Sequence, residues 1–114
     1  MKNELNEKIS SAMIKYLLGK ELRERIKKTE EAYIHAVEIG DEEYLKNHKL
    51  PSKTEMAESL GKECHLSTPT LLSYQCFTEA IEKVRKKNDK LIQQVLAGET
   101  NMTYRDLMNV LDAL

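Results

Sequence analysis

The sequence predicts a single-domain, all-α protein, and three observations support this fold class. The chain has 114 residues, of which 40% are hydrophobic, and this is enough for one modest core. Long stretches consist of Glu, Lys, Leu, Ile and Ala, which favour helices, whereas the chain has four Gly, two Pro and one Phe. Apolar residues also recur every three or four positions, as they do along one face of a helix.

The first helix is expected over residues 3–18, where one apolar stripe has helical spacing. The stripe consists of Leu5, Ile9, Met13, Tyr16 and Leu17. Gly19 either ends this helix or only weakens it. The same stripe can pack onto its own domain, or it can pair with the same helix of a second copy as a homodimer. The sequence leaves both alternatives open.

A second helical pattern begins near Glu21 and ends at Gly40, with an interruption at Thr29 and Glu30. It lies just before a pair of capped helices, so we expect it to support them as part of a three-helix unit. The following residues, 41–49, are mostly polar and have room for one short turn of helix.

The most informative stretch is the pair of helix starts within residues 50–74. Ser52 and Glu55 have the spacing of a capping box, and Gly61 is expected to end the helix that they begin. Ser67 is expected to cap a second helix, in whose first turn Pro69 is tolerated. Two capped helices around a glycine predict a helix-turn-helix, with the insertion Lys62–His65 lengthening its turn by four residues.

Three segments of this region resemble the helix-turn-helix of ParB-type partition proteins, and of small plasmid and phage DNA-binding proteins related to it. They are EMAESLG at 55–61, LSTPTLLSY at 66–74 and, more loosely, LAGETNMTYRDLMNVLDAL at 96–114. The resemblance covers roughly residues 50–114. It implies a non-catalytic DNA-binding protein that acts in transcription regulation, partition or replication of a mobile element.

Short helices are expected to brace the unit at its C-terminal side. The helix that starts at Ser67 keeps its apolar spacing into residues 85–87, where cations suit the negative end of the helix dipole. Asn88 or Asp89 can cap a further helix, and Thr103 caps a last one. We therefore divide the single domain into an N-terminal helix at 1–19, the helix-turn-helix unit at 21–87 and C-terminal helices at 88–114.

Docking of such a motif on duplex DNA places the start of its second helix in the major groove. The candidates for contacts with base edges are Thr68, Pro69, Leu72, Ser73 and Gln75. Cations that flank the pair are the candidates for phosphate contacts. They are Lys49, Lys53, Lys62, Arg85, Lys86 and Lys87. The formal net charge of the chain is -1, but residues 46–90 carry nine basic and six acidic side chains, whereas residues 1–45 and 91–114 each have a net negative charge.

A rival interpretation is a helical protein-interaction module that binds no nucleic acid. In the first interpretation Thr68, Pro69, Leu72 and Ser73 face the DNA bases. None of these four positions carries an Arg or a Lys, and this favours the rival interpretation. In that case Leu72 contacts a protein partner.

Other classes of protein lack support in the sequence. No nucleophile-base motif, phosphate-cradling glycine loop or HExxH is present, so we predict no enzyme activity and no cofactor. Cys64, His65 and Cys76 fall short of the four ligands of a zinc site, and we predict no metal. The polar start of the chain and the short apolar runs predict a cytoplasmic protein with no membrane segment.

Overall fold

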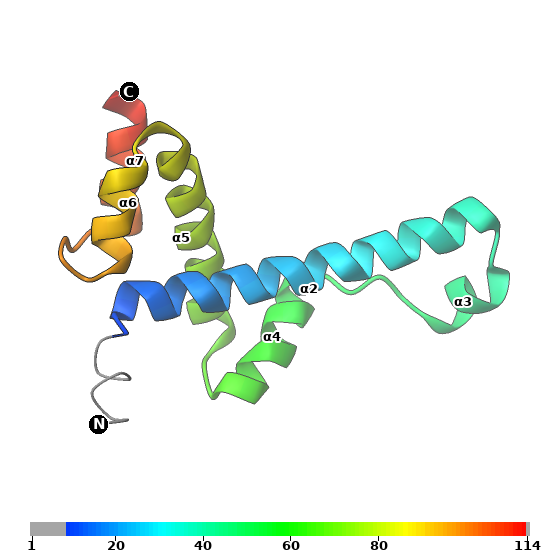
Figure 1. Ribbon diagram of the computed structural model, residues 1–114. Coiled ribbons are helices and arrows are strands. Elements are labelled where there is room, and N and C mark those ends of the chain that lie inside the picture. The colour runs from blue at the N-terminus through cyan, green and yellow to red at the C-terminus, as the bar shows by residue number, and fades with distance from the viewer. Residues whose placement is uncertain (1–8, 114) are drawn as a thin grey trace.

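The computed structural model describes residues 9–113, and these residues form six helices and no strand. This confirms the all-α prediction. Figure 1 shows their arrangement, in which the long helix α2 crosses α5, while α4 lies on one side of the crossing and α6 and α7 lie on the other. The helices are α2 (Ser11–Ile39), α3 (Glu42–Asn47), α4 (Lys53–Cys64), α5 (Thr68–Lys87), α6 (Asp89–Leu96) and α7 (Tyr104–Ala113).

Helix α2 is one continuous helix of 29 residues where the sequence suggested two. The interpretation of Gly19 as a helix end was wrong. A Cβ atom at Gly19 would overlap the side chain of Thr78 and the backbone carbonyl of Tyr74, so this glycine allows α5 to approach the backbone of α2. Gly40 does end α2, with the positive φ of 69° that the prediction requires. Residues 3–8 of the expected first helix, including Leu5, lie outside the described residues.

Two apolar cores lie along the crossing of α2 and α5. The first joins α2 and α5 to α6 and α7, and it contains Tyr16, Phe77 and Leu107. The second joins α2 and α5 to α4, and it contains Leu22, Ile26, Ala57, Leu60 and Leu71. The C-terminal helices therefore brace α5, as the sequence predicted, and α2, α4 and α5 share a core of their own.

The expected N-terminal stripe divides between these cores and the surface. Met13 and Tyr16 pack in the first core, whereas Ile9 and Leu17 are about half exposed, at 48% and 51%. Ile14, which was not part of the stripe, is exposed to a similar extent. The stripe is therefore not a single apolar face in the described residues.

The turn between α4 and α5 consists of only three residues, 65–67. Gly61 does not end α4, because the helix continues through Lys62 to Cys64 and ends at His65, which adopts a left-handed conformation with φ 58°. Gly61 is buried instead, and a Cβ there would lie 2.5 Å from the carbonyl oxygen of Leu66. Most of the expected four-residue insertion is thus an extra turn of helix rather than a longer loop.

The part of α2 after Ile26, residues 27–39, extends beyond both cores as an arm, with α3 beside it (Figure 1). The protein measures 51 × 39 × 23 Å, and its radius of gyration is 17.3 Å. A compact domain of this length would have a radius of gyration of about 13 Å. Ala36 is buried on the arm, whereas Ile34, Val37 and Ile39 are more than half exposed.

Candidate nucleic-acid interface

The start of α5 lies at the surface and is held by its own cap. The hydroxyl of Ser67 accepts a hydrogen bond from the backbone amide of Thr70 at 3.3 Å, and its oxygen lies 2.7 Å from the Thr70 hydroxyl. Pro69 occupies the first turn, as predicted. Pro69 and Ser73 are exposed and Thr68 is half-buried, so these three candidates can be reached from solvent.

Two of the predicted base-facing residues are not placed for that role. Gln75 is only 8% exposed and lines a groove that also contains Ile26 of α2, so its amide faces away from the outer side of α5. Leu72 is half-buried and packs against the second core. The cause is helical periodicity, because Gln75 follows the buried Leu71 by one turn. The side chain of Leu72 is therefore largely committed to packing.

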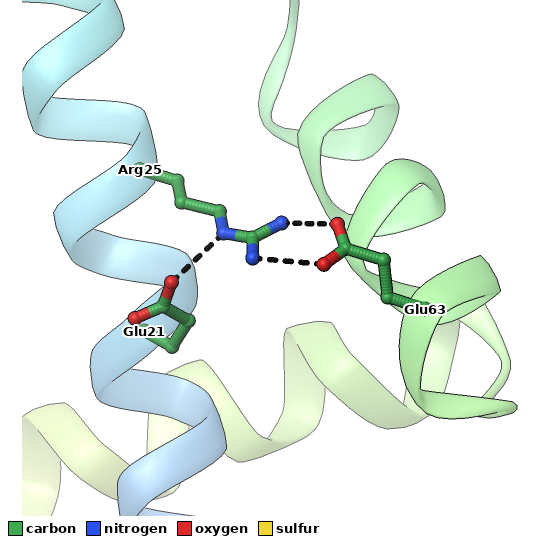
Figure 2. Close-up of polar contacts among 3 residues, drawn as sticks. All are labelled: Glu21, Arg25 and Glu63. Atoms are coloured by element: carbon green, nitrogen blue, oxygen red, sulfur yellow. Dashed lines mark hydrogen bonds and ion pairs between the residues drawn. The ribbon is translucent and has the colours of Figure 1, made fainter.

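An ion-pair network holds the last turn of α4 against α2 (Figure 2). The guanidinium of Arg25 donates to both carboxylate oxygens of Glu63, at 2.5 and 3.0 Å, and to Glu21 at 2.9 Å. Hydrogen bonding to Arg25 lowers the pKa of Glu63 below its ordinary value, and the bonds to Glu63 and Glu21 raise the pKa of Arg25. This network joins α4 to α2 just before the turn into α5.

The predicted phosphate contacts fall into two groups that lie far apart. Lys53 and Lys62 stand at opposite ends of α4, and Lys62 lies 3.7 Å from Glu58; both lysines are exposed, as is Lys49 before the helix. The second group, 85–87, forms the last turn of α5. At a rise of about 1.5 Å per residue, that turn lies roughly 25 Å or more from Ser67. Contrary to the expectation, these three cations do not surround the start of α5.

Arg85 is also less available to bind a phosphate than an exposed arginine would be. It is half-buried, its guanidinium lies 5.5 Å from the centre of the Tyr16 ring, and its Nε lies 3.7 Å from Asp89. Lys86 and Lys87 are exposed. The side chain of Arg85 is thus engaged in contacts within the protein.

A cavity of about 350 Å³ lies beside Ser73, between α2, α5 and the start of α7, and it brings together cations that the sequence analysis missed. Of the residues that the structure describes, Lys15 and Arg105 are the only charged ones in its lining, and none of them is a carboxylate. Tyr74, Phe77 and Tyr104 supply aromatic rings. Lys15 and Arg105 are 90 positions apart in the chain, so no local pattern could have paired them.

A second groove, of about 430 Å³, lies between α2 and α5 on the side of Gln75. Its charged lining is evenly mixed, with four basic and four acidic side chains, so it favours neither an anion nor a cation. Within residues 9–113, no three His, Cys, Asp or Glu side chains are placed to hold a metal ion together. None of the helices in that range has the length and apolar character needed to cross a membrane.

In comparisons with protein-family models, curated proteins and solved structures, no match to this chain is found. The resemblance to ParB-type proteins therefore stays a prediction from the sequence.

Proposed function

We propose that this protein binds duplex DNA without catalysing a reaction, and that the outer face of the first turns of α5 enters the major groove. The observation that carries the proposal is the exposed start of α5, at Pro69 and Ser73, directly after a three-residue turn. The opposite face of the same helix is anchored in two cores. By its resemblance, the protein is a cytoplasmic regulator, or a partition or replication accessory, of a mobile element.

The side chains on the outer face of α5 can recognise base sequence only weakly. Thr68 and Ser73 can donate hydrogen bonds to bases or accept them, and the threonine methyl can contact a thymine methyl. No Arg or Lys stands between Ser67 and Lys83 on α5. We therefore expect direct base contacts to give modest specificity, and phosphate contacts to supply most of the affinity.

Polar contacts between α2, α4 and α5 suit a DNA-binding helix that is held in a fixed position. Arg25 and Glu63 join α2 to the last turn of α4. The hydroxyl of Thr78 lies 2.9 Å from the carbonyl oxygen of Tyr16, which joins α2 to α5. A helix fixed from both sides loses little conformational freedom when it enters a groove.

A titration of labelled duplex at about 50 and about 200 mM salt tests the proposal, because affinity that depends on several phosphates falls steeply over this range. Lys62→Glu should weaken binding, since Lys62 stands in the last turn of α4, next to the turn. Lys28→Glu is the matched control, because Lys28 is an equally exposed lysine on the arm, away from α5. Absence of binding at the lower salt concentration would contradict the proposal.

One observation favours the alternative, a protein-interaction module. The arm exposes Ile34 and Val37, three positions apart and hence on one face of the helix, to 54% each. A protein partner held by these residues would bind with little dependence on salt. In that case Ile34→Glu with Val37→Glu would abolish partner binding, whereas Lys62→Glu would not change it.

A further inference from the structure

We propose that the cavity between α2, α5 and α7 holds a phosphate group of the nucleic-acid strand that α5 contacts. This inference rests on the proposed function and adds to it a site outside the helix pair. The cavity has a volume of about 350 Å³, within the usual range for pockets that take small ligand groups. The cavity adjoins the proposed DNA-binding face, because Ser73 lines the cavity and also lies on the outer face of α5.

The charge of the lining selects an anion. Lys15 enters from α2 and Arg105 from α7, and among residues 9–113 no carboxylate lines the cavity. Asp106, which follows Arg105 in the chain, does not line the cavity, and its carboxylate accepts a hydrogen bond from the backbone amide of Thr103 at 2.9 Å. This bond is the largest cause of the lowered pKa of Asp106, and it places the carboxylate in the cap of α7. An arginine beside a lysine is a pairing suited to phosphate oxygens.

Backbone donors add to the two cations. Ser11 and Ala12 in the first turn of α2, and Tyr104 and Arg105 in the first turn of α7, all line the cavity. Amides in a first turn have no acceptor within their own helix. The side chains of Ser10 and Thr103 take only the amides of Met13 and Asp106. The amides of four lining residues are thus left without a helical acceptor beside Lys15 and Arg105.

The aromatic part of the lining indicates that the phosphate belongs to a nucleotide. Tyr104 is 46% exposed and Tyr74 is half-buried, and both line the same cavity as the two cations. A tyrosine ring can stack on a base or pack against a sugar, and sequence has little influence on such contacts. The lining therefore fits a phosphate carried by a nucleotide unit better than an isolated inorganic ion.

The test compares two double variants that change the charge equally. Lys15→Glu with Arg105→Glu should weaken duplex binding at about 100 mM salt by tenfold or more, and should reduce the slope of log K against log salt by about one, the value for one lost phosphate contact. Lys28→Glu with Lys46→Glu, two exposed lysines of α2 and α3 outside every candidate contact, should change the slope less. Equal effects of the two double variants on affinity and slope would overturn the inference.

A second measurement separates failure of the inference from failure of the proposed function. We would titrate a thymidine hexanucleotide, and separately ATP, into the ¹⁵N-labelled full chain and follow the amide resonances of Ser11, Ala12, Tyr104 and Arg105. Saturable shifts in these amides, absent from Arg105→Gln, support the phosphate site even if duplex DNA does not bind. Shifts with the hexanucleotide assign the phosphate to a strand, whereas shifts with ATP and none with the hexanucleotide would overturn the inference in favour of a free nucleotide. No shift with either compound would overturn the inference. Arg105→Gln is a fair control because Arg105 is exposed and belongs to neither core, so the variant should keep its fold.

Discussion

Gly19 of α2 lies directly against Thr78 of α5, at the point where the two longest described helices cross. The Thr78 hydroxyl lies 2.9 Å from the carbonyl oxygens of both Tyr16 and Tyr74, so it can donate its proton across the crossing or within its own helix. Thr78 is fully buried. The missing side chain at position 19 therefore sets how closely the two backbones pack, and thereby the position of α5 relative to both cores.

The first prediction concerns this crossing. Gly19→Ala should lower the free energy of unfolding by about 1–3 kcal/mol, because the added methyl group meets a buried backbone carbonyl that cannot move aside without shifting α5. Urea unfolding followed by circular dichroism measures the change. Lys20→Ala, at the exposed neighbouring position, should stay within about 0.5 kcal/mol of the wild type. A Gly19→Ala protein that is more stable than the wild type would mean that the helices do not cross so closely.

The second prediction concerns the pH dependence of the Arg25–Glu63 pair. The folded-state pKa of Glu63 lies below its ordinary value of 4.5, so the pair stabilises the fold fully above that value. The contribution is lost as the pH falls through the lowered folded pKa, when Glu63 becomes protonated. The wild type should therefore be more stable than Glu63→Gln at about pH 7, and the difference should shrink as the pH falls from about 4.5 to about 2.

Urea unfolding at a series of pH values measures this difference, and Glu43→Gln is the control. Glu43 is an exposed glutamate on α3, outside this network, so its variant should follow the wild type more closely. A difference between wild type and Glu63→Gln that does not change with pH would show that the charge of Glu63 contributes nothing.

The third prediction concerns the cap that begins α5. Ser67→Ala removes the acceptor for the Thr70 amide and should destabilise the protein by about 1 kcal/mol. Under the proposed function it should also weaken duplex binding, because the first turn then frays. Ser73→Ala is the matched control for stability, since Ser73 is exposed and caps nothing. Equal stability of the two variants would show that the cap does not hold the turn.

The fourth prediction concerns a homodimer through the N-terminal helix, which the sequence analysis left open. Met13 and Tyr16 are engaged in the first core, so a second copy would have to cover Ile14 and Leu17, which are 47% and 51% exposed. We expect light scattering to give a dimer for the wild type and a monomer for Ile14→Glu with Leu17→Glu. Ile34→Glu with Val37→Glu on the arm should remain dimeric. A wild-type monomer at high concentration would end the dimer proposal.

The starts of α4, α5, α6 and α7 could be predicted from the sequence because each depends on residues three positions apart, whereas the caps of α2 at Ser10 and of α3 at Asp41 were missed. The capping box of Ser52 and Glu55 is present, Asn88 caps α6, and Thr103 pairs with Asp106 at the start of α7. Such caps are local, and local spacing is visible in a sequence.

The roles of two glycines could not be predicted because they depend on distant segments. Gly61 was expected to end a helix and Gly19 either to end one or to weaken it, yet each lies within a helix and makes room for another part of the backbone. Only the packed structure shows which part that is.

The candidate site divides in the same way. Exposure of Pro69 and Ser73 followed from the position of the cap, whereas the burial of Gln75 depends on α2 lying beside it. Lys15 and Arg105 line one cavity only because α2 and α7, near the two ends of the described chain, both lie beside α5. No spacing rule within one helix could have predicted it.

The arm, which consists of α2 after Ile26 together with α3, allows the protein to unfold in part. Both cores draw their α2 residues from Ile26 or earlier, so the arm can melt without exposing either core to water. Its amide hydrogens should accordingly exchange with deuterium well before those of α5, in a partial opening that leaves the rest of the protein folded. The rank order of exchange, rather than one melting temperature, is then the appropriate description of this protein's stability.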